Sequence, residues 1–277
     1  SGESLMKVEA SGICGSDMHA YHGKDPRRVP PLILGHEVAG TVVSGEGEGE
    51  RMVINPLITC GRCPFCDTGR SNLCPDRELI GMRLAGAYAD LVAIPSINLI
   101  PIPETLDSVR ASLAEPTATA LHALNLAMQA SRRPLAELRT LVIGGGAIGL
   151  LAALLLKGYG CKSLVVSEPH TMRRESVSRH AGCKVHDPIN DPALETDAFD
   201  LVIDAVGGGV TRKGAMAAVS PGGIFVHIGL MDSGEGLDIR KLTLFEVSLL
   251  GVYCYTAADM RAAVNAIAEG MVGDLDW

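Results

Sequence analysis

Aromatic residues and positive charge are both scarce in this chain. Its 277 residues include only 4 Phe, 1 Trp and 5 Tyr, and 24 Lys and Arg face 32 Asp and Glu, a net charge of −8. A protein that binds nucleic acid needs a basic surface for the phosphates, and a base-stacking platform needs aromatic rings. The composition therefore argues against nucleic acid as a partner, while 47% hydrophobic residues permit a sizeable folded core.

A long uninterrupted hydrophobic run is also lacking. The most apolar stretch, residues 141–156, is shorter than the roughly 20 residues that a membrane span requires, and three consecutive glycines interrupt it. The first four residues show neither the basic start nor the apolar centre of a secretory leader. We therefore expect no membrane association and a cytoplasmic protein, in which thiols stay reduced.

The pattern changes once along the chain. Residues up to about 110 contain short β-rich runs at 38–43, 51–54 and 88–94, broken by frequent Pro and Gly, which predicts a mostly β domain. A helical run at 112–130 follows, and apolar strands then alternate with helices. The six predicted strands are residues 140–143, 163–167, 184–186, 201–204, 224–228 and 248–253. Such alternation predicts an α/β fold with a doubly wound parallel sheet of the Rossmann type. A last amphipathic helix is expected at 258–269.

Four cysteines crowd into one short segment, with gaps of two, two and seven residues. They are Cys60, Cys63, Cys66 and Cys74. Four thiolates within one loop can close a tetrahedron around Zn²⁺, and a site with no open position is structural. Two disulfides, free thiols or an iron–sulfur cluster are the alternatives.

A second set of ligand-type residues is dispersed. Cys14 lies in a Gly-rich turn that also holds Ser16, Asp17 and His19, and His36-Glu37 follows some twenty residues later. Cys14, His36 and a carboxylate can bind a catalytic zinc and leave one position open. Alone, a Cys and a distant His more often indicate a buried thiol and a hydrogen-bonded imidazole; the four-cysteine segment downstream favours the metal.

A glycine-rich turn lies between a predicted strand and an apolar helix. Gly144, Gly146 and Gly149 match G-x-G-x-x-G, with Ala147 and Ile148 opening the helix. The glycines allow a tight turn and close approach of a pyrophosphate, which the N–H groups of the helix N-terminus would bind. A glycine turn that only packs helix on strand is the alternative.

An acidic residue follows the glycine turn at the end of the next predicted strand. Glu168 stands 24 residues after Gly144, where a carboxylate accepts the ribose hydroxyls and repels a 2′-phosphate. This favours NAD over NADP. Arg173 and Arg174 leave NADP open, since either can pair with a phosphate or be a solvated helix charge.

These motifs together resemble the zinc-dependent medium-chain dehydrogenase family, with its polyol branch of sorbitol, idonate, galactitol and threonine dehydrogenases as the nearest group. The resemblance covers nearly the whole chain and implies a GroES-like mostly β catalytic domain at residues 1–115. It implies a Rossmann NAD(P)-binding domain at 116–256 and a C-terminal helix at 257–277 that returns to the catalytic domain. Dimers or tetramers are also implied, through the apolar strand at 248–253.

The resemblance also assigns roles to individual residues. Cys14 and His36 are the expected catalytic zinc ligands, with Glu37 and Glu115 as the carboxylates beside them. Ser16 is expected to take the substrate proton and His19 to relay it to solvent, while Asp17 orients His36. Thr119 and the backbone around Gly229 are expected to face the nicotinamide.

The implied activity is hydride transfer between NAD(P) and a secondary alcohol of a polyol or sugar-acid type, with two Zn²⁺ per chain. A zinc-free reductase of the same fold is disfavoured by the cysteines and His36. A threonine-type amino-alcohol dehydrogenase and a non-catalytic nucleotide- or zinc-binding relative remain as alternatives.

Overall fold

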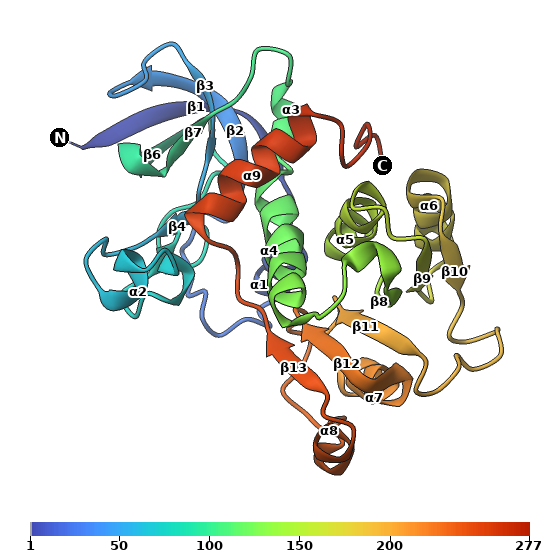
Figure 1. Cartoon of the computed structure of the whole chain (residues 1–277). Helices are drawn as coiled ribbons and strands as arrows, with labels where there is room; N and C mark the ends of the chain where they lie inside the picture. The colour runs from blue at the N-terminus through green and yellow to red at the C-terminus, as the bar shows by residue number, and fades with distance from the viewer. Residues whose placement is uncertain (1) are drawn as a thin grey trace. The chain divides into compact units, whose positions relative to one another are not determined.

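The computed structural model describes residues 2–277 and divides the chain into two compact units (Figure 1). Unit 1 holds the chain up to Ala118 together with Cys254–Gly270. Unit 2 holds Thr119–Tyr253 and Met271–Trp277.

Unit 1 is built on a five-stranded antiparallel sheet in the order β6-β1-β2-β3-β7. Its strands are β1 (Glu3–Gly12), β2 (Glu37–Ser44), β3 (Arg51–Ile54), β6 (Leu91–Pro95) and β7 (Leu99–Pro101). Met6, Ile54 and Ile94 lie in the buried core of this sheet. The strands predicted at 38–43 and 51–54 are confirmed. The strand predicted at 88–94 begins only at Leu91, because Ala87 and Tyr88 donate their N–H groups to the loop carbonyls of Gly35 and Leu34.

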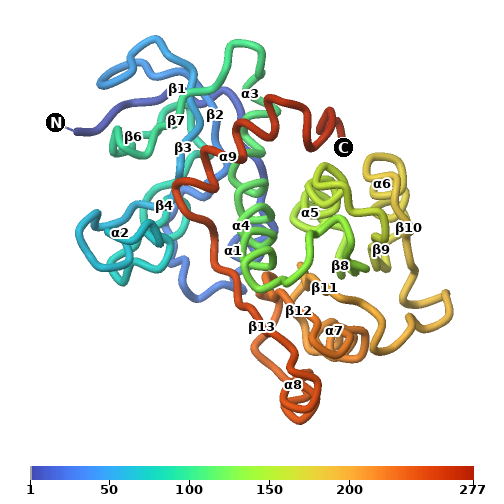
Figure 2. The backbone as a smooth tube through the Cα atoms, in the orientation of Figure 1, coloured from blue at the N-terminus to red at the C-terminus, as the bar shows by residue number. Residues whose placement is uncertain are grey.

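Short elements surround this sheet. They are α1 (Gly15–Tyr21), the two-stranded sheet of β4 (Leu57–Ile58) and β5 (Glu78–Leu79), α2 (Pro64–Asp67), α3 (Ser108–Ala111) and 3-10 turns at Ser71–Leu73 and Ser96–Asn98. The helix predicted at 112–130 is α4 (Ala114–Ala130), whose first five residues belong to unit 1. The tube in Figure 2 shows α9 (Ala257–Ala268) returning to lie beside α3, which it contacts.

Unit 2 contains a six-stranded parallel sheet in the order β10-β9-β8-β11-β12-β13. The strands are β8 (Arg139–Ile143), β9 (Ser163–Ser167), β10 (Lys184–His186), β11 (Phe199–Asp204), β12 (Val219–His227) and β13 (Ser248–Gly251). Counted along the chain this order is 3-2-1-4-5-6, in which the direction of winding reverses between β8 and β11. The predicted doubly wound sheet is confirmed.

The helices of unit 2 lie between successive strands, except that β10 and β11 are joined by the irregular residues 187–198. They are α5 (Ala147–Gly158), α6 (Thr171–Ala181), α7 (Gly209–Ala218) and α8 (Ile239–Leu244), with a 3-10 turn at Leu135–Glu137 before β8. Eight consecutive residues of α5 are buried, so this helix lies within the packed interior as its apolar sequence predicts. It begins directly after the glycine turn, which sets the position of that turn at the carboxyl end of β8.

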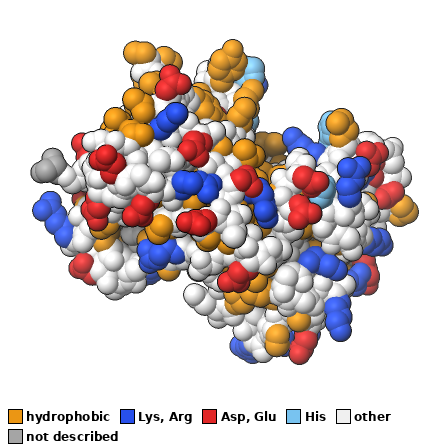
Figure 3. Space-filling view, turned by 90° about the horizontal axis from the view of Figure 1, so that it is seen from above, with side chains coloured by type: hydrophobic (Ala, Val, Ile, Leu, Met, Phe, Trp, Pro, Cys, Tyr) orange, Lys and Arg blue, Asp and Glu red, His pale blue; other side chains and the backbone are white. Residues whose placement is uncertain are grey.

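The surface carries both signs of charge. Figure 3 shows acidic and basic side chains interspersed over the face that it presents, without a continuous basic field. Among residues 2–277, no helix combines the length and apolar character that crossing a membrane requires.

Candidate functional site

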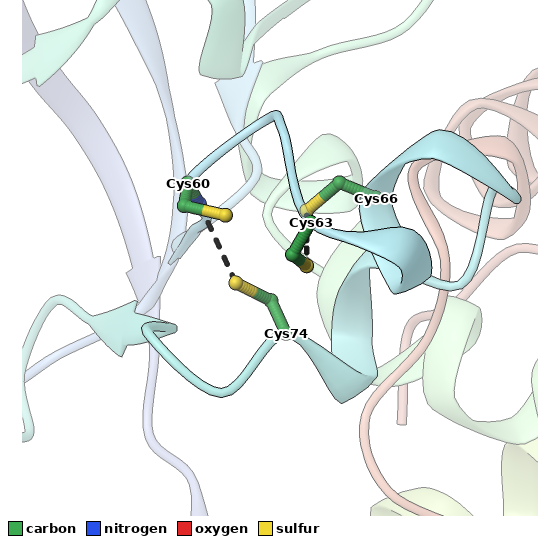
Figure 4. Close-up of side chains that lie close together, drawn as sticks. All are labelled: Cys60, Cys63, Cys66 and Cys74. Carbon is green, nitrogen blue, oxygen red and sulfur yellow. Dashed lines mark hydrogen bonds between the residues drawn. The ribbon is translucent and has the colours of Figure 1, made fainter.

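The four cysteines of unit 1 converge on one point (Figure 4). Their sulfur atoms all lie within 4.8 Å of one another, and the Sγ atoms of Cys63 and Cys66 are 3.5 Å apart. Cys63 stands at the start of α2, where Pro64 fixes the first turn, and Cys74 ends the 3-10 turn at Ser71–Leu73. Four thiolates around zinc would place their sulfurs about 3.8 Å apart, whereas a disulfide needs about 2 Å. The spacing therefore suits a tetrahedral metal ion.

Cys14, His36 and Glu37 form a second group, and their ligand atoms also lie within 4.8 Å of one another. The pairing of β1 with β2 brings them together, because it sets Gly12 opposite Glu37. Cys14 then begins α1 directly after β1. Gly12 leaves room for the Glu37 carboxylate, since a Cβ atom at this position would lie 2.0 Å from one of its oxygens.

Asp17 lies beside the imidazole of His36. Asp17 is 2% exposed, and its Oδ1 atom lies 3.4 Å from Nδ1 of His36 while Oδ2 accepts a 2.8 Å hydrogen bond from Tyr88. Burial opposes a charged imidazole, but the interactions with Asp17 and Cys14 outweigh it and raise the pKa of His36. With Nδ1 facing a carboxylate, Nε2 is the ring nitrogen left to bind a metal.

Two buried carboxyl groups lie beside this histidine. Burial, together with the charge of Glu115, raises the pKa of Glu37 to about 8, and burial also raises the pKa of Glu115. Glu115 lies outside the 4.8 Å group and interacts with Tyr255. Two buried carboxylates repel each other, so a bound cation would stabilise their charged forms.

The chemistry of this donor set fits a zinc ion. One thiol, one imidazole and a carboxylate are the ligand types that Zn²⁺ takes, and three protein ligands leave a position for water or substrate. Ser16 lies beside this donor set, as its hydroxyl donates a 3.3 Å hydrogen bond to Cys14 Sγ. His19 is exposed one turn further along α1. The expected metal ligands Cys14, His36, Glu37 and Glu115 all belong to unit 1.

The expected cofactor residues all belong to unit 2. Gly144 has a φ of +98° and donates its N–H to Ser167 at the end of β9, and Gly146 caps α5. At Gly149 a Cβ atom would lie 1.8 Å from the carbonyl oxygen of Gly144. The glycines therefore let the turn close tightly over the first turn of α5, as the G-x-G-x-x-G interpretation requires. Ala147 and Ile148 begin the helix as expected.

Glu168 holds the glycine turn in place. Its carboxylate accepts hydrogen bonds from the N–H of Gly145 at 2.7 Å and from that of His170 at 2.8 Å, and the residue is 3% exposed. Both oxygens thus already contact the backbone, a structural role that sequence reasoning did not foresee.

The two arginines on α6 differ in their surroundings. Arg174 donates to the carbonyls of Glu168 and Pro169 and pairs with Asp187 at 2.8 Å, so it is a structural residue. Arg173 is exposed and lines a surface pocket together with Gly145 and Gly146. Of the two, Arg173 is placed to meet a ligand at the glycine turn.

Thr119 and Gly229 are placed differently within unit 2. Thr119 lies on α4, and Gly229 follows β12. The N–H of Gly229 bonds to the carbonyl of Asp204, and a Cβ atom there would lie 2.1 Å from the backbone of Val206. Gly229 therefore lies at the carboxyl end of the sheet, next to the β11–α7 loop.

Three residues of the metal group were not foreseen from the sequence: Arg28, Tyr88 and Tyr255. Arg28 and Tyr88 contact Asp17 from other loops, and Tyr255 meets Glu115 from the C-terminal segment of unit 1. None of them belongs to a spaced ligand motif, so only the folded structure shows their contact with the site.

Comparison with known proteins identifies the family. The alcohol dehydrogenase GroES-like domain matches residues 1–104, and the zinc-binding dehydrogenase domain matches residues 147–269. The chain is also 32% identical to 2-dehydro-3-deoxy-L-galactonate 5-dehydrogenase of Pseudoalteromonas atlantica, over 98% of this chain and 82% of that protein. The chain belongs to the zinc-binding dehydrogenase family. The resemblance inferred from the motifs is confirmed, and the chain is an oxidoreductase of the alcohol dehydrogenase type.

Two further relatives support this assignment. L-galactonate-5-dehydrogenase of Escherichia coli K12 is 30% identical over 98% of this chain and 81% of that protein. A protein of Sinorhizobium meliloti 1021, solved as a zinc-binding dehydrogenase bound to NADP, superposes with a TM-score of 0.88 at 32% identity, over 98% of this chain and 82% of that one. Zinc and a nicotinamide dinucleotide are therefore the cofactors of this family of enzymes.

Proposed function

We propose that this protein oxidises a secondary hydroxyl group of a polyol or sugar acid, with reduction of NAD. The observation that carries the proposal is the group of half-buried Cys14 and buried His36 and Glu37, with the Ser16 hydroxyl beside it. Two relatives of similar length are named as dehydrogenases acting at carbon 5 of sugar acids, which supports the substrate class. In the reaction the carbinol carbon loses a hydride to NAD⁺, the hydroxyl loses a proton, and a ketone, NADH and H⁺ result.

The chain's own residues divide this work. Cys14, His36 and Glu37 would hold the zinc ion, with Glu115 as the neighbouring carboxylate. A zinc ion there supplies a Lewis acid that lowers the pKa of the substrate alcohol. The Ser16 hydroxyl would take the alcohol proton as it gives up its own, and exposed His19, one helical turn away, would pass a proton on to water. Asp17, whose Oδ1 lies 3.4 Å from Nδ1 of His36, would orient the imidazole toward the metal.

The glycine turn would bind the dinucleotide. The free N–H groups at the start of α5 suit a pyrophosphate, and Thr119 and Gly229 would face the nicotinamide. We propose NAD as the preferred cofactor, since the Glu168 carboxylate places negative charge beside Gly145, where a 2′-phosphate would be repelled. Arg173 is the residue that would reverse this preference.

The test of substrate class is a screen for reduced nicotinamide with polyols, sugar acids, their phosphates and threonine, each with NAD and NADP. Turnover of a polyol or sugar acid is expected. Turnover of threonine alone would favour the amino-alcohol alternative, and no turnover at all would contradict the proposal.

The cofactor preference is tested in the same assay by comparing kcat/KM for NAD and NADP. We expect NAD to be favoured at least tenfold, which corresponds to about 1.4 kcal/mol. An NADP preference of that size, lost in Arg173→Ala, would show that Arg173 outweighs Glu168.

We also propose a homodimer or homotetramer formed through β13. This strand is an edge of the parallel sheet, and Leu249 on it is partly exposed. An apolar edge strand invites pairing with another chain. Light scattering at micromolar concentration should give at least a dimer; a monomer would contradict this proposal.

A further inference from the structure

A buried arginine, Arg28, donates hydrogen bonds to Ser16. The side chain of Arg28 is 2% exposed, although it comes from an irregular loop between α1 and β2. A fully buried guanidinium is rare unless its donors are satisfied. Its partners therefore show what the loop is built to hold.

Arg28 makes four hydrogen bonds and one longer ion-pair contact. Nε donates to the carbonyl of Gly81 at 2.8 Å. Nη1 donates to the carbonyl of Ser16 at 2.8 Å and to Asp25 at 3.0 Å. Nη2 donates to the Ser16 hydroxyl at 3.0 Å and lies 3.5 Å from Oδ1 of Asp17. Two of these hydrogen bonds are therefore to Ser16, one to its backbone carbonyl and one to its side-chain hydroxyl.

This arrangement fixes the direction of the Ser16 hydroxyl. A serine hydroxyl has one proton to donate and two lone pairs that accept. A guanidinium offers only donors, so the oxygen must present a lone pair to Arg28 and cannot point its proton there. The proton points instead toward Cys14 Sγ, 3.3 Å away. The second lone pair is left to accept a hydrogen bond from the substrate hydroxyl.

We propose that Arg28 is a positioning residue that clamps the Ser16 hydroxyl toward the Cys14 sulfur. The inference rests on the function proposed for Ser16, and it adds the residue that sets the orientation of that hydroxyl. Lysine would not replace Arg28, because an ammonium is a single point of charge and lacks the planar fork that reaches both Ser16 atoms.

The neighbouring arginine provides a matched control. Arg27 pairs with the same carboxylate, Asp25, through Nε at 2.9 Å, but its side chain is 50% exposed. Its Nε and Nη2 atoms both donate to the Asp25 carboxylate, at 2.9 and 3.0 Å. Arg27→Met thus removes a charge and an ion pair from the same loop and leaves the clamp in place.

Kinetics of Arg28→Met, Arg28→Lys and Arg27→Met test the clamp with the best substrate of the screen. We expect kcat to fall about 10- to 100-fold in both Arg28 variants. KM for NAD should stay unchanged, and Arg27→Met should stay within twofold of the parent. Full activity in Arg28→Met would overturn the proposal. Full activity in Arg28→Lys would overturn it too, because charge alone would then be sufficient.

A double-variant cycle shows whether Arg28 acts through Ser16. In a Ser16→Ala background, Arg28→Met should change kcat by less than twofold, since there is no hydroxyl left to orient. A further loss equal to that in the parent would mean that Arg28 acts through another partner such as Asp17, and would overturn the clamp.

Crystal structures of the same variants give a readout that needs no turnover. In Arg28→Lys, and in Arg28→Met if it folds, the Ser16 hydroxyl should occupy a second rotamer; in Arg27→Met it should keep its contact with Cys14. An unchanged Ser16 in the Arg28 variants would refute the clamp. Failure of the parent protein to oxidise any alcohol would instead refute the proposed function, and the Ser16 rotamer would still decide the clamp.

Discussion

The two groups of metal-type ligands in unit 1 are assembled in opposite ways. The four-cysteine group comes from a single segment of fifteen residues held by α2 and a 3-10 turn. The group of Cys14, His36 and Glu37 is assembled by pairing two strands, and buried acidic and basic residues surround it. The first group offers four thiols and no other type of ligand; the second offers three different donors with a hydroxyl beside them.

The difference separates a structural role from a chemical one. A loop with two-residue strands has little core of its own, so the four thiols and their metal would stabilise it. The second group stands on the five-stranded sheet, whose core exists without any ion. Removing a ligand should therefore damage the fold in one case and the reaction in the other.

Cys14→Ala is expected to give the largest effect. Loss of the metal that activates the alcohol should lower turnover at least about 10³-fold. NAD binding and the melting temperature should change little, because the expected cofactor residues all lie in unit 2 and the core of unit 1 is untouched. Steady-state kinetics, cofactor titration and thermal melting measure the three quantities. Cys183→Ala, a thiol in neither group, is the control, and normal turnover in Cys14→Ala would contradict the catalytic role.

Cys63→Ala is expected to affect stability first. Three thiolates bind zinc poorly, and the binding energy lost is folding energy of the loop. The melting temperature should fall, and limited proteolysis should cut between Pro56 and Asp76. Turnover per folded molecule should remain, measured against the same Cys183→Ala control. An unchanged melting temperature together with lost turnover would reverse the roles of the two groups.

A smaller effect is expected on the pH dependence of folding stability in protein stripped of metal. It should arise from the carboxyl group of Glu37 in the second group. Glu37 has a folded pKa of about 8 against 4.5 for the free side chain. Between these values the folded state keeps a proton that the unfolded state has lost, so stability is highest at low pH and falls as pH rises toward 8. Melting of chelated protein from pH 5 to 8 should show this decline, and Glu37→Gln should make it less steep, leaving the part that the raised pKa values of Glu115 and His36 contribute. An equally steep decline in Glu37→Gln would show that Glu37 does not contribute to it.

Much of the fold could be predicted from sequence because local patterns carried it. The strands at Ser163–Ser167 and Lys184–His186 have the predicted bounds, since short apolar runs between clear breaks leave little choice. The strand at Leu91 was predicted to start three residues early, because its first residues make loop hydrogen bonds instead. β4, β5 and β7 are only two or three residues long and have no pattern of their own.

The site could be predicted only in part. The spacing of the four cysteines indicates a metal site, and the spacing of the glycines indicates a dinucleotide-binding turn. The contact of Cys14 with His36 was expected from resemblance, and its physical cause, Gly12 opposite Glu37, lies in strand register. Arg28 could not be predicted, because a charged loop residue is ordinarily solvent-exposed and only tertiary packing makes this one buried.

Zinc content tests the central claim most directly. Metal analysis of the purified parent protein, Cys14→Ala and Cys63→Ala should find close to two zinc ions per chain in the parent and close to one in each variant, since two independent ligand sets are each broken once. One zinc ion in the parent, or two in Cys14→Ala, would contradict the account of one structural and one catalytic metal site.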